Sequence, residues 1–204
     1  MVILLSNDDG YSSLGIQALR QSLSTIAKVY VVAPDKEQSA VSHKITFNQP
    51  IRIKQIDETT FTTDASPADC VKAAFLHLVP EKIDLVVSGI NHGPNMGTDV
   101  FYSGTVAAAR EGAIKGVPGI AFSLNSFQKN LDFLSAALWA SKIVSQFYKQ
   151  LQPGHILNVN FPFFENAKSQ DFLGVKITKL GQRVYQEKFI QQYDPMGNPY
   201  YWLG

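Results

Sequence analysis

The residues best suited to chemistry form short polar runs, and each run directly follows an apolar stretch of strand length. The first run is Asn7-Asp8-Asp9-Gly10, which comes after the apolar residues 2–5. Two adjacent carboxylates repel each other and raise each other's pKa unless a positive charge lies close to them. The pair therefore indicates a bound divalent cation. The same run would also suit a plain turn that caps the next helix, and the residues alone leave both interpretations open.

Two further polar runs offer oxygen ligands for the same cation. The loop from Pro34 to Ala40 contains Ser39, which taken alone would be an ordinary loop serine, and Ser88-Gly89-Ile90-Asn91 ends on an amide. Carboxylate, hydroxyl and amide oxygens suit Mg²⁺, Mn²⁺ or Ca²⁺ rather than zinc. The single cysteine, Cys70, excludes an intrachain disulfide and a cysteine zinc site, and its helical, apolar surroundings favour a place in the core.

A glycine-rich stretch offers a place for a phosphate group beside that cation. Four glycines fall within sixteen residues, and they are Gly89, Gly93, Gly97 and Gly104. Ser103-Gly104-Thr105 then opens a helical run over residues 106–114. A helix N-terminus carries free N–H groups and the positive end of the helix dipole, and glycines let the backbone approach a ligand. The stretch matches neither the Walker pattern nor the Rossmann fingerprint, and a surface loop with an ordinary Ser/Thr cap is the alternative interpretation.

The elements that must position these runs alternate along the chain. Apolar runs predict strands at residues 2–5, 28–33, 84–88, 119–124 and 156–160, with helices at 14–26, 68–79 and 131–151 between or after them. This pattern predicts an α/β fold with a Rossmann-like parallel sheet and helices on both faces. Because open parallel sheets bind ligands at the carboxyl ends of their strands, we expect the polar runs to meet there.

Two segments interrupt the alternation. Residues 44–47 and 51–54 read as the strands of a β-hairpin within an excursion at about 43–56. From Gly174 onward, Val175, Ile177 and Leu180 alternate with polar residues, and the tail is rich in turn residues. We expect this part to be a C-terminal extension of strands rather than a second core.

Composition narrows the classes of function. The 204 residues include 18 Lys+Arg and 17 Asp+Glu, for a net charge of +1, so charge gives no argument for a nucleic acid polymer or a membrane surface as partner. Hydrophobic residues make up 45% and charged residues 17%, which suits a compact chain. Without an apolar stretch long enough to span a membrane, or a basic segment that would begin a signal peptide, we expect a cytoplasmic protein.

Several of these runs together resemble one family. Residues 3–10, the long run from Ser88 to Gly112, and the segments Val32-Ala33-Pro34-Asp35, Pro67-Ala68-Asp69-Cys70 and Gln192-Tyr193-Asp194-Pro195 resemble the SurE family of stationary-phase survival proteins. The resemblance implies a metal-dependent phosphatase of Rossmann-like fold that hydrolyses nucleoside 5′- and 3′-monophosphates, with polyphosphate as a further substrate. It also implies nucleoside monophosphates as partners and a homodimer or homotetramer.

The resemblance assigns roles to particular residues. It implies that one divalent cation per subunit, Mg²⁺ or Mn²⁺, is bound by Asp8, Asp9, Ser39 and Asn91. It implies that the phosphate group is bound by Asn95, Ser103, Gly104 and Thr105. Asp8, Asp9 and Asn95 would be the catalytic residues. By position alone, His92 could serve as an acid, a base or a phosphate contact.

A domain division goes with this resemblance, and the sequence departs from the usual family pattern at two places. Residues 1–165 would form the catalytic domain, and residues 166–204 an extension for subunit contacts. The chain has Ala65-Ser66-Pro67 where the family usually has Gly-Thr-Pro, and it stops after Tyr201-Trp202-Leu203-Gly204 where similar proteins continue. We therefore expect a truncated C-terminus, and the alternative function is a catalytically impaired module that binds nucleotide and metal.

Two rival classes each lack a required residue. A phosphatase of the haloacid dehalogenase type needs an aspartyl nucleophile where this chain has Asn7, and an amide cannot form the acyl phosphate. A receiver-like signalling module needs an aspartate at the end of the third predicted strand, where this chain has Ser88 and Asn91.

Overall fold

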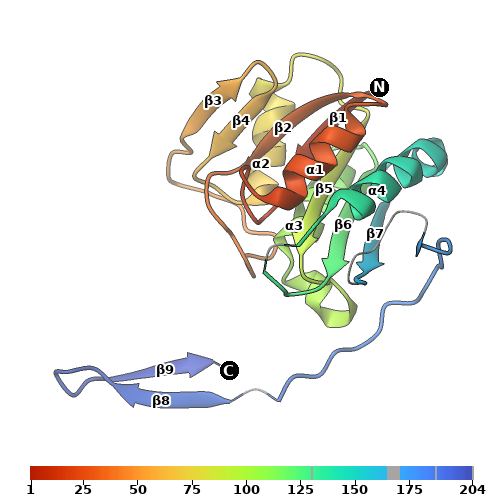
Figure 1. The fold of residues 1–204 in the computed structure, drawn as a ribbon. Coiled ribbons are helices and arrows are strands. Elements are labelled where there is room, and N and C mark those ends of the chain that lie inside the picture. Colours follow the sequence, from red (N-terminus) through yellow and green to blue (C-terminus); the bar gives the residue numbers. More distant parts are fainter. Residues whose placement is uncertain (130, 165–170, 187, 204) are drawn as a thin grey trace.

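The body of the protein is one sheet of seven strands, in the order β3-β4-β2-β1-β5-β6-β7 (Figure 1). The structure is a computed structural model that describes residues 1–129, 131–164, 171–186 and 188–203. The strands of the sheet are β1 (Val2–Ser6), β2 (Lys28–Pro34), β3 (Ile53–Asp57), β4 (Thr60–Thr63), β5 (Leu85–His92), β6 (Gly119–Asn125) and β7 (Ile156–Pro162). All neighbours pair in parallel except β3, which is antiparallel to β4. The predicted α/β fold is confirmed.

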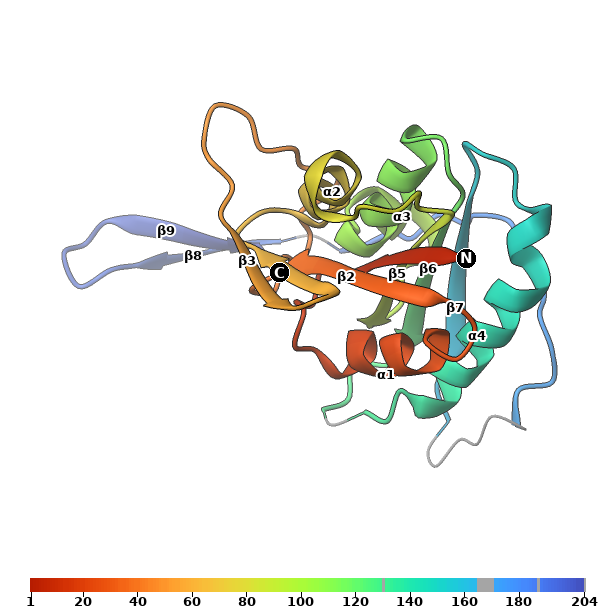
Figure 2. The ribbon, with the colours of Figure 1, turned by 90° about the horizontal axis from the view of Figure 1, so that it is seen from above.

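Helices cover both faces of the sheet, which Figure 2 shows edge-on. One face carries α1 (Leu14–Leu23) and α4 (Leu134–Phe147), and the other carries α2 (Pro67–Ala73) and α3 (Gly104–Ile114). Short helical turns follow or precede three of them: η1 (Ala74–Leu78), η2 (Gly97–Phe101) and η3 (Tyr148–Gln150). The predicted helix at 131–151 is thus shorter, and the helix at 68–79 continues as the π-helical turn η1.

The core lies in two layers because successive side chains of a strand point to opposite faces. In β1, Ile3 and Leu5 belong to the cluster under α1 and α4, whereas Leu4 belongs to the cluster under α2. Strand β5 divides in the same way, with Leu85 and Val87 on one side and Val86 on the other. Such strands are apolar on both faces, which is why they are legible in the sequence as continuous apolar runs.

The predicted hairpin exists, but its position in the sequence was wrong. The antiparallel strands are β3 and β4, and the chain turns between them at Glu58 and Thr59. Residues 44–47 form no strand, and the backbone N–H and side-chain hydroxyl of Thr46 donate instead to the Asp69 carboxylate at the start of α2. The reason is that β4 pairs in parallel with β2, so the buried threonines of β4, not residues 44–47, extend the sheet.

The C-terminal extension is confirmed as strands, although not where the alternation lies. Residues 174–186 form no strand, while β8 (Phe189–Tyr193) and β9 (Pro199–Leu203) form a two-stranded antiparallel hairpin. This hairpin stands away from the sheet in Figure 1. The expected domain boundary between residues 165 and 166 lies outside the described residues.

Candidate active site

The polar runs meet in one cavity at the carboxyl ends of β1 and β5, beside the loop that follows β2. The cavity has a volume of about 420 Å³. It is lined by Asp8, Asp9, Glu37, Ser39, Ala40, Asn91, His92, Asn95, Asp99, Tyr102, Ser103 and Phe127. Six of the sequence-predicted site residues are in this set. The other two, Gly104 and Thr105, adjoin it at the start of α3.

Asp8 lies directly against the N-terminus of α3. Its side chain is buried, and the Thr105 hydroxyl donates a hydrogen bond to Asp8 Oδ1. A Cβ on Gly104 would lie 2.8 Å from Asp8 Cβ and 2.9 Å from Asp8 Oδ2, so only glycine fits at this position without movement. The close approach of Asp8, in the loop after β1, to Gly104 therefore brings a carboxylate to the end of the helix whose dipole favours negative charge.

The two aspartates make the site electrostatically strained in the absence of a cation. Burial raises the pKa of Asp8, although hydrogen bonds from Thr105 and Gly104 partly oppose this. Burial, the charge of Asp8 and the more distant charge of Glu37 raise the pKa of Asp9 to about 7, against the backbone N–H of His92, which donates to Asp9 Oδ2 at 3.2 Å. A cation between the carboxyl groups would favour their ionised forms.

Asn91 presents an oxygen beside Asp8. Its Nδ2 donates to the carbonyl of Gly93 at 2.8 Å, which fixes the amide, and its Oδ1 lies 3.2 Å from Thr105 Oγ1. A threonine hydroxyl has one proton, and here it faces both Asp8 and Asn91. Asp8, Asn91 and Thr105 thus form one cluster of oxygens that three different elements bring together.

Several hydrogen bonds hold Asn95 in the wall of the cavity. Its side-chain Nδ2 donates to Ser123 Oγ at 2.9 Å, and its backbone N–H donates to Asn160 Oδ1 at 2.8 Å. The carbonyl of Asn95 accepts from Asn158 Nδ2 at 2.8 Å and from Asn160 Nδ2 at 3.0 Å. Side chains of β6 and β7 therefore fix the loop that follows β5, and with it one wall of the cavity.

Ser39 and Ser103 both reach the cavity, but each already has a partner. Ser39 is exposed, and its hydroxyl donates to Glu37 Oε1 at 2.6 Å. Ser103 is the N-cap of α3, where its Oγ accepts from the backbone N–H of Val106 at 3.0 Å. The Ser/Thr cap expected as the alternative interpretation of this run is thus present, and it forms part of the cavity wall.

The ring of His92 is engaged in holding a neighbouring loop. Its Nε2 lies 2.8 Å from the carbonyl oxygen of Gln128, and the ring packs edge-on against Phe133. The ring therefore links the end of β5 to the loop after β6, while the backbone N–H of His92 donates to Asp9.

The donor set of the cavity fits a hard divalent cation. Of the described residues that line the cavity, none is a lysine or an arginine that could balance Asp8 and Asp9. Among the described residues, no three His, Cys, Asp or Glu side chains are grouped so that they alone could hold a metal ion, so a cation here would also need the amide and hydroxyl oxygens. Two carboxylates with amide and hydroxyl oxygens are the ligands that Mg²⁺ or Mn²⁺ prefers.

Five lining residues were missed as site residues by the sequence reasoning: Glu37, Ala40, Asp99, Tyr102 and Phe127. Glu37 shares its loop with Ser39, so its neighbourhood was a usable signal. Asp99 and Tyr102 lie inside the glycine-rich stretch, but nothing in the sequence indicates which of its side chains face the cavity. Phe127 follows β6, which reaches this edge only because of the strand order.

A family model, curated relatives and a solved structure all match this chain, and all of them belong to one protein family. The family model described as "Survival protein SurE" matches residues 3–187. The 5′-nucleotidase SurE of Syntrophomonas wolfei is 46% identical over all of this chain and 78% of its own length. The 5′-nucleotidase SurE of Myxococcus xanthus is 47% identical over 99% of this chain and 76% of its own. The crystal structure of the SurE protein from Aquifex aeolicus is similar with a TM-score of 0.86 and 43% identity, covering 100% of this chain and 82% of that one.

Proposed function

Since the chain belongs to the SurE family of survival proteins, we propose that it hydrolyses nucleoside 5′-monophosphates to nucleoside and inorganic phosphate. It is a 5′-nucleotidase, and the observation that carries this conclusion is the full-length similarity to enzymes of that name together with the intact acidic cavity. The proposal extends to nucleoside 3′-monophosphates and polyphosphate, which present the same terminal phosphate. Nothing in the described residues favours the alternative of an impaired binding module.

The proposal includes one divalent cation, Mg²⁺ or Mn²⁺, held by Asp8, Asp9, Ser39 and Asn91. The support is the buried carboxylate pair with raised pKa values, the oxygen of Asn91 beside Asp8, and the lack of a basic side chain among the described lining residues. Ser39 would exchange its bond to Glu37 for the cation. When bound, the cation neutralises phosphate charge and makes a water molecule more acidic.

The substrate phosphate would lie at the N-terminus of α3. Gly104 and Thr105 are the first two residues of the eleven-residue helix α3, and Ser103 is its N-cap. The first turn of the helix contains no acidic residue. The helix dipole there favours a dianion, and the N–H groups of Gly104 and Thr105, which donate to Asp8 in the structure, would be shared with the phosphate. Asn95 would contact the phosphate from the cavity wall, where its four hydrogen bonds hold it in place.

The hydrolytic step follows from this placement. A water molecule oriented by Asp8 or Asp9 attacks phosphorus on the side opposite the ester oxygen, and the bond from phosphorus to that oxygen breaks. The aspartates accept the proton that the attacking water loses, and the leaving nucleoside takes up a proton. The donors at the start of α3 and Asn95 stabilise the negative charge on the remaining phosphate oxygens in the transition state.

The proposal also covers the setting of the enzyme. The helices of the described chain include none that is long and apolar enough to span a membrane. We place the enzyme in the cytoplasm, as a homodimer or homotetramer. Residues 1–165 would form its catalytic domain and residues 166–204 would make the subunit contacts.

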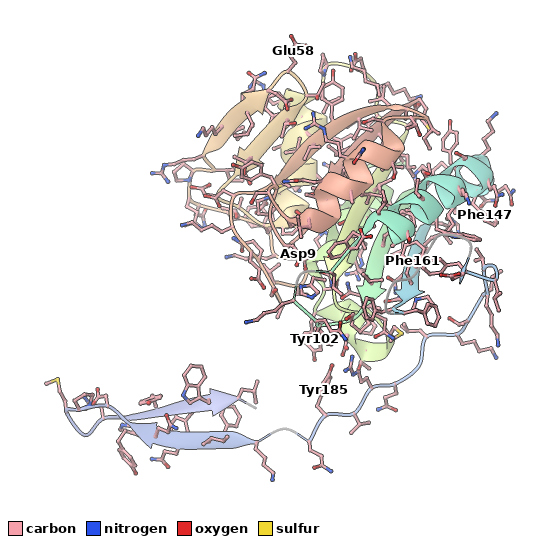
Figure 3. The ribbon with its side chains drawn as sticks, in the orientation of Figure 1. Asp9, Glu58, Tyr102, Phe147, Phe161 and Tyr185 are labelled. Atoms are coloured by element: carbon pink, nitrogen blue, oxygen red, sulfur yellow. The ribbon has the colours of Figure 1, made fainter. Side chains whose placement is uncertain are left out.

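The test is phosphate release from AMP by the purified chain with Mn²⁺, with Mg²⁺ and with a chelator. Release should need the cation, and Asp8→Ala should abolish both release and Mn²⁺ binding measured by calorimetry. Figure 3 places Glu58 at the opposite end of the sheet from Asp9, so Glu58→Ala is the matched loss of a remote, exposed carboxylate and should behave as the unaltered chain.

Two outcomes would contradict the proposal. One is a folded, metal-binding chain that releases no phosphate from any nucleoside monophosphate. The other is an Asp8→Ala variant with the circular dichroism spectrum and the activity of the unaltered protein, because it would move the chemistry away from this cavity.

A further inference from the structure

Two aromatic side chains on the wall of the catalytic cavity have no role in packing the sheet. Phe127 is 72% exposed and Tyr102 is 63% exposed, and both line the cavity that contains Asp8 and Asp9. Neither belongs to the hydrophobic clusters found among the described residues. Large aromatic surface left open inside a polar cavity is typical of a ligand-binding wall.

The ring of Phe127 is held beside the residues proposed to bind the cation. A Cβ on Gly93 would lie 2.5 Å from Phe127 Cε1, so the ring rests on the bare backbone of Gly93. The carbonyl of Gly93 is fixed by Asn91 Nδ2 at 2.8 Å. The contact of His92 Nε2 with the carbonyl of Gln128, at 2.8 Å, anchors the loop that carries Phe127. The open face of the ring is therefore a fixed feature of the cavity.

Tyr102 is fixed on the side of the phosphate cradle. Its backbone N–H donates to the carbonyl of Asp99 at 3.0 Å, its carbonyl accepts from the N–H of Ser42 at 2.8 Å, and Ser103 follows it directly. Figure 3 shows Tyr102 at the same end of the sheet as Asp9. A substrate phosphate at the start of α3 would thus leave the rest of the molecule next to aromatic surface.

The cavity has room for much more than a phosphate group. A phosphate and one cation take the space of a few water molecules, each of which occupies about 30 Å³ in the liquid. The cavity volume is about 420 Å³, within the range that encloses small organic ligands. Most of the cavity is therefore left for the part of the substrate that carries no charge.

We infer that Phe127 and Tyr102 form a nucleoside subsite, in which the Phe127 ring stacks on the planar base of the substrate. The inference rests on the proposed function, which places the phosphate at α3. Stacking uses the π-face that every base has, so the subsite would accept all bases and favour the larger purines. It would distinguish nucleotides from phosphate esters that lack a ring.

The test measures binding without turnover. We would determine by calorimetry the Kd of adenosine and the Kd of inorganic phosphate for four chains: the unaltered protein, Phe127→Ala, Phe127→Trp and Phe47→Ala. Phe47 is a matched control because it is 75% exposed and lines neither this cavity nor the second one. Since Phe127 is largely exposed, its replacement should leave the melting temperature nearly unchanged.

Loss of one stacked ring should weaken adenosine binding about tenfold in Phe127→Ala and leave phosphate binding within about twofold. Phe127→Trp should restore the adenosine affinity, and Phe47→Ala should match the unaltered protein. The inference is overturned if the unaltered chain does not bind adenosine, if Phe127→Ala binds it equally well, or if adenosine and phosphate weaken together. A chain that binds adenosine through Phe127 yet releases no phosphate from AMP would refute the proposed function and keep the subsite.

Discussion

At the scale of single residues, the carboxylates of Asp8 and Asp9 repel each other when both are ionised, and a bound cation would reduce this repulsion. Asp8 and Asp9 are adjacent, largely buried and raised in pKa, and Glu37 adds a third negative charge nearby. The contacts that favour their ionised forms come from one threonine hydroxyl and a few backbone N–H groups. The ionised carboxylate pair should therefore lower the free energy of unfolding of the metal-free protein, and the size of this loss should depend on pH.

The sign of that dependence follows from the pKa of Asp9. The folded protein holds a proton with a pKa of about 7, whereas an unperturbed aspartate has 3.8. Between these values the unfolded chain has released the proton and the folded chain has not, so stability falls as pH rises toward 7 and stays low above it. In chelator, Asp9→Asn should thus melt at a higher temperature than the unaltered chain at pH 8, with a smaller gain at pH 5.

Saturating Mn²⁺ should reverse this order, because the unaltered chain gains a ligand that Asp9→Asn holds less well. Thermal unfolding followed by circular dichroism provides the measurement, with Glu58→Gln as an exposed carboxylate control. An Asp9→Asn chain that is less stable than the unaltered protein at pH 8 in chelator would show that the carboxylate pair is not a source of strain.

At the scale of elements, the site depends on a strap that crosses from the C-terminal extension. Arg183 Nη1 pairs with Asp99 Oδ2 at 2.7 Å, the Tyr185 hydroxyl donates to the same oxygen at 2.8 Å, and Thr98 Oγ1 donates to the carbonyl of Arg183 at 3.0 Å. The carbonyl of Asp99 in turn accepts from the N–H of Ser103 at 3.1 Å. Figure 3 shows Tyr185 just beyond Tyr102 at this end of the molecule.

Arg183 should therefore act as a positioning residue for the phosphate cradle. We expect Arg183→Ala to raise the KM for AMP by up to about fivefold, because the pair is partly exposed and such pairs are worth about 1 kcal/mol or less. Arg183→Lys should recover part of the loss. The measurement is steady-state kinetics with saturating Mn²⁺.

Arg20→Ala is the matched control for this prediction. Arg20 also pairs with an aspartate, Asp57, and its side chain is 37% exposed against 40% for Arg183, but it lies on α1 away from the cavity. Equal KM values for Arg183→Ala and Arg20→Ala would mean that the strap does not support the cradle.

The same scale explains what the sequence could predict. Strands β1, β2 and β5 are buried on both faces, so their apolar runs mark them, and the polar residues that follow them reach one edge by the rule for parallel sheets. The hairpin was predicted at the wrong residues because β4 is a strand by virtue of its pairing with β2, about 30 residues earlier, and no local pattern indicates that pairing. The bond between Arg183 and Asp99 spans 84 residues, and no local pattern indicates it.

At the scale of the whole molecule, the chain divides into a body with its own two-layered core and a hairpin arm without one. Every residue of β8 and β9 is exposed, and the arm carries Tyr193, Tyr201 and Trp202. A two-stranded hairpin is marginally stable in isolation. An arm with this much apolar surface should be covered in solution, and a second copy of the chain is the partner that we propose.

Charges placed on the arm should therefore separate the copies. We expect the unaltered chain to sediment as a dimer or tetramer and the double variant Tyr201→Asp, Trp202→Asp to sediment as a monomer, because two desolvated carboxylates cannot be accommodated in an apolar contact. Phe47→Asp is the control, since it adds a charge at an exposed aromatic position on the body, where Phe47 is 75% exposed against 56% for Tyr201 and 61% for Trp202. If the body folds on its own core, the monomer should keep its far-UV circular dichroism spectrum and bind Mn²⁺. An unaltered chain that sediments as a monomer at all concentrations, or a double variant that remains associated, would remove the arm as the subunit contact.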